Sequence, residues 1–165
     1  MDFPQRKPLR LKAYDYTQGW YFVTVCTANR APCLGMCVGA DAHIGPHIRL
    51  SGYGRIAERF IKTIPGIDAY VIMPNHVHLT LALDDTNGPM WASAPTQPLS
   101  SRIRSFKTLT GKAVGFRLWQ RSFYEHAIRN EDDYLRIRQY MADNPAHWLE
   151  DKYYKTTEIG GNTHV

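Results

Sequence analysis

Residues 69–83 read AYVIMPNHVHLTLAL, and this stretch decides the fold of the chain. Two runs of apolar and β-branched residues, 69–73 and 76–83, are separated only by Pro74 and Asn75. Pro and Asn are residue types that favour turns, whereas the flanking runs are typical of strands. The stretch therefore predicts two strands that follow one another with only a short turn between them.

The residues before this stretch predict a further buried strand and a helix. Residues 20–27 read WYFVTVCT, a run of aromatic and β-branched residues that indicates a strand. Ser51 can act as the N-cap of a helix that runs through Ile64. The remaining expectations here are a loop or irregular hairpin over residues 31–46, a short strand over residues 47–50, and a helix stop at Pro65 and Gly66.

The residues after the stretch predict two more helices with a strand between them. The first helix is capped by Ser100 or Ser101 and runs to about Val114. A polar, Pro-containing linker over residues 84–97 precedes it. The other expectations are a strand over residues 118–128 and a final helix that is capped by Asn130 and ended by Pro145.

This order of elements predicts an α+β fold, namely a ferredoxin-like plait. Its antiparallel sheet would carry helices packed on one face, with a tyrosine-bearing helix near the C-terminus. A length of 165 residues fits one domain, expected over residues 1–155. Residues 1–19 suit a basic N-terminal arm, and residues 156–165 suit a disordered tail.

Charge and composition narrow the class of partner. The chain has 20 Lys and Arg against 15 Asp and Glu, a net charge of +5 that favours polyanions. No run approaches the roughly 18 apolar residues of a membrane span, so a cytoplasmic protein without a membrane partner is expected.

Three cysteines do not suggest a disulfide framework. A zinc site from Cys33, Cys37, His43 and His47 is disfavoured, because the gap between the two pairs is too short for a classical finger.

The residues with the strongest chemical interest are two histidines and a tyrosine. His76 and His78 lie two apart in a strand, so both imidazoles point to the same face and can share a metal ion. Tyr140 and Asn144 are four apart on the last helix, where Asn144 can add an oxygen ligand. Such a site suits Mg²⁺ or Mn²⁺ bound together with a phosphate, which the tyrosine could attack. The alternative is that Tyr140 is an ordinary residue of an amphipathic helix and that Asn144 merely belongs to the C-terminal cap of that helix.

Four segments of the chain resemble the IS200-like transposases of the HUH superfamily, and in particular the REP-associated tyrosine transposases. They read RLKAYDYTQGWYFVTVCTANR, YVIMPNHVHLTLAL, SFKTLTGK and LWQRSFYEHAIRNEDDY, the last of which leads into YMADNPAHW. Together they span about residues 9–150. The combination of MPNHVH with a later tyrosine that is followed four residues on by Asn-Pro is specific. The resemblance covers neither the loop at residues 33–47 nor the long linker.

The resemblance implies a metal-dependent enzyme that cuts and rejoins single-stranded DNA. His76 and His78 would be the metal-binding pair and Tyr140 the nucleophile. Asn144 would take the ligand place that many relatives fill with glutamine. The resemblance also implies a ferredoxin-like plait, a bacterial cytoplasmic protein at the nucleoid, hairpin DNA as partner and a possible homodimer. The rival tyrosines, Tyr124 and Tyr134, have no ligand-type residue four positions on.

Basic residues indicate where DNA would bind. Residues 101–140 hold nine Lys or Arg against four Asp or Glu, so the positive charge is concentrated around the proposed nucleophile. The candidate phosphate contacts are Arg102, Arg104, Lys107, Arg117 and Arg121, with Arg6, Lys7, Arg10 and Lys12 of the arm. The candidate stacking residues for unpaired bases are Trp119, Phe123 and Tyr124.

Two other functions fit the same residues. A non-catalytic relative could bind hairpin DNA as a regulator, or a hydrolase could use the histidines as metal ligands and water as nucleophile. Only the tyrosine mechanism leaves DNA covalently attached to the protein.

Overall fold

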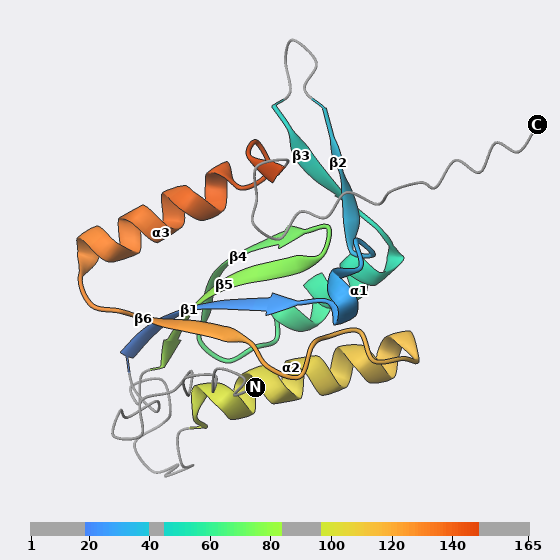
Figure 1. The fold of residues 1–165 in the computed structure, drawn as a ribbon. Helices are drawn as coiled ribbons and strands as arrows, with labels where there is room; N and C mark the ends of the chain where they lie inside the picture. The colour runs from blue at the N-terminus through green and yellow to red at the C-terminus, as the bar shows by residue number, and fades with distance from the viewer. Residues whose placement is uncertain (1–18, 40–44, 84–96, 149–165) are drawn as a thin grey trace, which may run out of the picture.

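The computed structural model describes residues 19–39, 45–83 and 97–148, and Figure 1 shows how their elements are arranged. In chain order these are β1 (Gly19–Cys26), the 3-10 turn η1 (Ala28–Arg30), β2 (Gly35–Val38), β3 (His47–Leu50), α1 (Gly52–Ile61), β4 (Ile67–Met73), β5 (His76–Leu83), α2 (Leu99–Val114), β6 (Tyr124–Ile128) and α3 (Glu131–Asp143).

Four strands form one antiparallel sheet in the order β4, β5, β1, β6, while β2 and β3 pair separately. The succession β1, α1, β4, β5, α2, β6, with β1 between β5 and β6, is that of a ferredoxin-like plait. The predicted α+β class and plait are therefore confirmed, as are the two strands predicted in the 69–83 stretch, which pair with each other.

Each face of the sheet is covered by its own helices. Val77 and Leu79 of β5 belong to the large core cluster, which includes residues of α1 and α2. On the opposite face, Phe22 packs against Ile137 and Met141 of α3. The expected layer of helices on one face is thus formed by α1 and α2, whereas α3 lies on the other face (Figure 1). The difference arises because α3 has an apolar stripe of its own, which covers the face that the first two helices leave open.

Several predicted boundaries shift. The Ser51 side chain accepts a hydrogen bond from the Gly54 N–H, which confirms the N-cap of α1. The helix α2 starts at Leu99 after Pro98, without a side-chain cap. The strand expected over residues 118–128 is reduced to β6, because only Trp119 of the preceding segment forms an isolated bridge, with Thr27. The loop or irregular hairpin expected at residues 31–46 contains β2.

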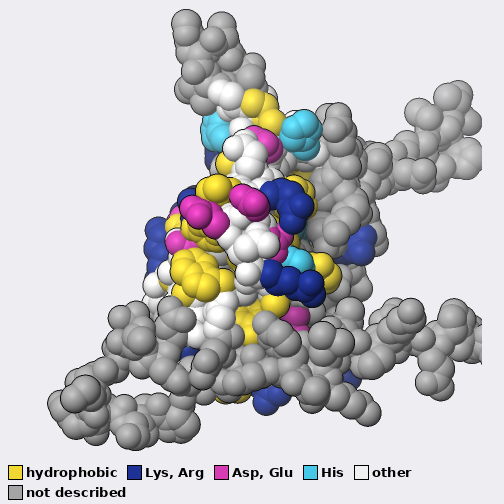
Figure 2. Space-filling model, turned by 90° about the vertical axis from the view of Figure 1, so that its left-hand side faces the viewer, with side chains coloured by type: hydrophobic (Ala, Val, Ile, Leu, Met, Phe, Trp, Pro, Cys, Tyr) yellow, Lys and Arg dark blue, Asp and Glu magenta, His cyan; other side chains and the backbone are white. Residues whose placement is uncertain are grey.

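A carboxylate ties the start of α3 to β6. The Asn130 side chain caps the helix by accepting from the Asp133 N–H, as predicted. The Asp133 carboxylate accepts from Arg136 at 2.6 Å and pairs with His126 Nε2 at 2.8 Å. These hydrogen bonds, from Arg136 first and then His126, lower the pKa of Asp133 to about 2. Figure 2 shows this side of the molecule, where a His lies beside Lys and Arg side chains.

The depressed pKa of Asp133 predicts an acid-dependent loss of stability. Its folded-state value of about 2 lies below the ordinary 3.8, so the stabilisation is present above 3.8 and is lost as the pH falls towards 2. We expect Asp133→Asn to be less stable than the native protein near neutral pH, with a shallower fall of the unfolding free energy across this window. Denaturant titrations at a series of pH values measure this. The matched control is Asp132→Asn, an exposed neighbour; an equal change in both variants would contradict the prediction.

Some sequence predictions fall outside the described residues. These are the arm with Arg6, Lys7, Arg10 and Lys12, the linker over residues 84–96, His43, and the tail over residues 156–165. Within the described ranges, no group of three His, Cys, Asp or Glu side chains could hold a metal ion. None of the helices in those ranges is long and apolar enough to cross a membrane.

Candidate active site

The two histidines lie side by side in the sheet. His76 and His78 belong to β5, which runs between β1 and β4, so strands cover both of its edges. Both side chains are almost fully buried, at 0% and 1% exposed. Their Nε2 atoms are 3.1 Å apart, which confirms that the two imidazoles share one face of the strand.

The other nitrogen of each imidazole is held by a polar side chain. His76 Nδ1 lies 2.8 Å from Asn75 Oδ1, and His78 Nδ1 lies 2.7 Å from Thr24 Oγ1 of β1. The Asn75 amide is itself oriented, because its Nδ2 donates to the Arg30 carbonyl. Asn75 Oδ1 can then only accept, which places the His76 proton on Nδ1 and leaves Nε2 as a ligand atom. Neither Asn75 nor Thr24 was predicted as a site residue.

The helix α3 positions Tyr140 beside this histidine pair. The Tyr140 hydroxyl oxygen lies 3.4 Å from His78 Nε2, although the two residues are 62 positions apart. The ring packs edge-on against Phe22, with centroids 6.1 Å apart and an interplanar angle of 81°. The Tyr140 side chain is still 42% exposed, so a substrate can reach the hydroxyl. The helix and its apolar contacts thus set the position of the hydroxyl within one chain.

Asn144 is the residue that follows α3. Its Nδ2 donates to the Tyr140 carbonyl at 2.9 Å, which turns the side chain back along the helix. Its Oδ1 is buried and has no hydrogen-bond partner among the described residues. A buried carbonyl oxygen without a partner costs free energy unless something binds it. Two facing Nε2 atoms and a buried amide oxygen on the residue that follows α3 are donor types that fit Mn²⁺ or Mg²⁺.

A cleft of about 290 Å³ opens between the sheet and α3 at this site. Phe22 and Thr24 of β1, His78 of β5, Tyr140 of α3 and Tyr124 of β6 line it. The rival Tyr134 is used elsewhere, because its hydroxyl donates to Asp68 at 2.9 Å. His126, Asp133, Arg136 and Ile137 complete the lining.

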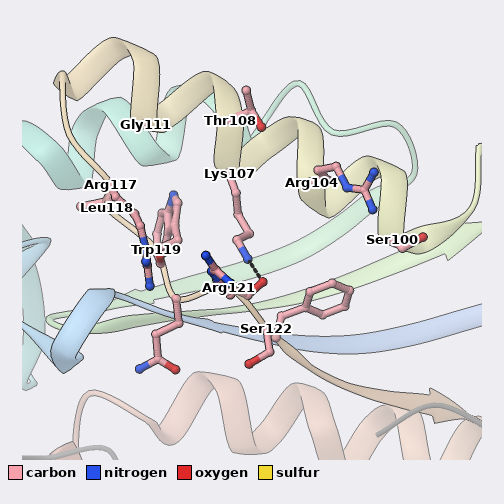
Figure 3. A pocket seen from close by; sticks show the side chains of 12 residues that line it. Ser100, Arg104, Lys107, Thr108, Gly111, Arg117, Leu118, Trp119, Arg121 and Ser122 are labelled. Atoms are coloured by element: carbon pink, nitrogen blue, oxygen red, sulfur yellow. Dashed lines mark hydrogen bonds between the residues drawn. The ribbon is translucent and has the colours of Figure 1, made fainter. Parts of the chain in front are cut away.

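The predicted basic residues separate into two groups. Arg104, Lys107, Arg117 and Arg121 line a groove of about 620 Å³ between α2 and residues 117–123 (Figure 3). The prediction that Arg102 contacts a phosphate is corrected by the structure. Arg102 is buried, and its guanidinium donates to the carbonyls of Gln97 and Pro65. This contact fixes α2 against the turn after α1, which leaves Arg102 unsuited to hold DNA.

The predicted stacking residues also differ in access. Trp119 is buried, with its ring packed beside Phe106 and its Nε1 donating to Thr110 Oγ1, so it cannot stack on a base. Tyr124 is exposed and Phe123 half-buried. Of the three predicted stacking residues, only Phe123 and Tyr124, at the entry to β6, are therefore accessible.

Several known proteins are similar to this chain. An uncharacterized protein of Haemophilus influenzae is 33% identical over 90% of this chain and 93% of that protein. A REP-associated tyrosine transposase of Escherichia coli is 35% identical over 48% of this chain and 43% of its own length. A solved REP-associated tyrosine transposase bound to a REP hairpin is 25% identical, with a TM-score of 0.60 over 84% of this chain and 73% of that one. No protein-family model matches the chain.

Proposed function

Because the chain belongs to the REP-associated tyrosine transposases, we propose that it cuts and rejoins single-stranded DNA beside hairpins through a covalent bond to Tyr140. The observation that carries the proposal is the 3.4 Å approach of the Tyr140 hydroxyl to His78 Nε2. A tyrosine oxygen is thereby held against a buried pair of metal-ligand atoms, at the end of an open cleft.

In the proposed reaction, the Tyr140 oxygen forms a bond to the phosphorus of the scissile phosphate. The bond from phosphorus to the 3′ oxygen breaks, the 3′ oxygen keeps the electron pair, and the tyrosine proton is released. The DNA remains joined to the protein as a 5′-phosphotyrosine, which conserves the energy of the phosphodiester. Attack by a 3′ hydroxyl on the same phosphorus reverses the step, returns a proton to Tyr140 and rejoins a strand.

The cleft residues bind and orient the reacting groups. His76 and His78 would hold Mg²⁺ or Mn²⁺ through Nε2, with Asn144 Oδ1 as a third ligand. When bound, the ion polarises the scissile phosphate and neutralises charge as the new bond forms. Thr24 and Asn75 keep the imidazoles in position, as oriented ligands require. The packing of Tyr140 on Phe22 restricts the directions from which its oxygen can attack.

The partner that we propose is hairpin DNA with a single-stranded flank. A family member with a solved structure is bound to a REP hairpin, and that ligand suggests the same class for this chain. Such a substrate would place the protein in the bacterial cytoplasm, at the nucleoid. The homodimer expected from the resemblance stays a prediction, since His76, His78 and Tyr140 already meet within one chain.

Incubation with labelled single-stranded palindromic oligonucleotides, with Mg²⁺, Mn²⁺ or a chelator, tests the proposal. We expect a slow-migrating species on a denaturing gel that requires the metal and disappears after protease treatment. Binding without an adduct or cleavage, across palindromes of the native genome, would instead support a non-catalytic hairpin-binding regulator. Cleavage without an adduct would indicate a hydrolase that uses water.

A further inference from the structure

The groove between α2 and residues 117–123 is lined by four cationic side chains. Arg104 and Lys107 extend from α2, while Arg117 and Arg121 extend from the facing segment, as Figure 3 shows. No acidic residue is among the described residues that line it, and none of the four cations has an ion-pair partner in the described part of the chain. A concave surface with unbalanced positive charge attracts anions.

Two of the four cations of this groove, Lys107 and Arg117, are held in place by hydrogen bonds to backbone carbonyls. Lys107 Nζ donates to the Arg121 carbonyl at 2.6 Å, and Arg117 Nε donates to the Trp119 carbonyl at 3.3 Å. Burial, and then the charge of Arg117, lower the pKa of Lys107. Burial and the nearby Arg117 charge thus disfavour the charged form of Lys107, and a bound phosphate would stabilise that form.

The groove and the catalytic cleft lie on opposite sides of one sheet edge. β6 is the last strand of the sheet and pairs only with β1, so its outer edge is uncovered by other described strands. Side chains of an extended segment alternate between the two faces. Accordingly Phe123 lines the groove, whereas the next residue, Tyr124, lines the cleft. A DNA strand that passes round this edge would leave the groove at Phe123 and enter the cleft at the neighbouring residue, Tyr124.

We propose that the groove binds the phosphate backbone of the strand that flanks the cut, and that this strand reaches Tyr140 round the edge of β6 at Phe123 and Tyr124. The inference rests on the proposed function, because it names the path of the same DNA. The contacts assigned to the groove are those of its four cations with phosphate oxygens, which carry no information about base identity.

A comparison of two double variants tests the path. Lys107→Ala with Arg117→Ala removes two charges from the groove, and Lys112→Ala with Arg59→Ala removes two exposed helix charges that do not line it. For an oligonucleotide with both flanks, we expect the groove variant to raise Kd about tenfold, as loss of two charge-assisted contacts allows. Its plot of log K against log salt should lose about one unit of slope per cation. The control should stay within about twofold, as expected for exposed charges.

A shortened oligonucleotide then distinguishes specific binding of the flank in the groove from nonspecific electrostatic attraction. Removal of one of the two flanks should abolish the difference between the groove variant and the native protein. An equal penalty on the shortened oligonucleotide, an equal penalty in the control variant, or no penalty at all would each overturn the proposal. Methylphosphonate links in that flank provide a test on the native protein, where they should weaken binding; unchanged Kd would also refute it.

Adduct formation in the same samples distinguishes this inference from the proposed function. Flank-dependent binding without any adduct would overturn the function of Tyr140 and leave the groove assignment standing. Adduct formation with flank-independent binding would do the reverse. Iodouracil placed between the cut and the flank should crosslink to Phe123 or Tyr124, and crosslinks confined to other elements would contradict the path round β6.

Discussion

Tyr140→Phe is expected to abolish the covalent adduct and to lower DNA cleavage on the order of 10³-fold or more, as removal of a nucleophile does. The substitution removes one oxygen and keeps the ring that packs against Phe22, so the fold and the cleft should persist. Binding to hairpin DNA should change by less than about twofold, since one uncharged hydroxyl contributes little to affinity. A denaturing gel measures the adduct, and a filter or gel-shift titration measures the binding.

The two rival tyrosines supply the controls. Tyr134→Phe removes the hydrogen bond to Asp68 of β4, and Tyr124→Phe removes the hydroxyl of a residue that lines the cleft. Both variants should still form an adduct that depends on Tyr140. If Tyr140→Phe retained the adduct while Tyr124→Phe lost it, the nucleophile would be misassigned.

The fold could be predicted from the sequence because its strands and helices are locally consistent. The structure contains the elements that were predicted from the 69–83 stretch, from the Ser51 cap and from the Asn130 cap. The failure over residues 118–123 has a tertiary cause. That run has strand-like composition, yet it turns away from the ladder to bury Leu118 and Trp119 against the core with Phe106. Composition reports burial there, and burial does not require a strand.

The site could be predicted only where its residues are close in sequence. His76 with His78 is a spacing that one strand explains, and Tyr140 with Asn144 is a spacing that one helix explains. Thr24 contacts His78 across 54 residues, and only the register of β1 against β5 reveals that pair. Arg102 shows the converse error, because helical spacing alone did not distinguish a buried contact to Pro65 from an exposed charge.

His76→Ala and His78→Ala are each expected to lower metal-dependent cleavage by at least about 10²-fold, because loss of a ligand removes the stabilisation that the ion gives to transferring phosphate. Each substitution also leaves a cavity beside a buried imidazole, so thermal unfolding must be measured alongside. Isothermal titration with Mn²⁺ gives a second readout that does not depend on DNA. The matched control is His47→Ala, since His47 is an exposed histidine of β3.

The residues behind the histidines should give a graded version of the same effect. Thr24→Val and Asn75→Ala leave both Nε2 atoms present but remove the groups that hold Nδ1. We expect metal affinity and cleavage to fall by roughly 10- to 100-fold, as for other orienting partners of ligand histidines. Excess Mn²⁺ should restore cleavage in these two variants but not in Tyr140→Phe, because only the tyrosine variant lacks the attacking oxygen. Rescue of none would separate the histidine pair from metal binding and leave His76 and His78 with a structural role, whereas rescue of Tyr140→Phe as well would contradict Tyr140 as the nucleophile.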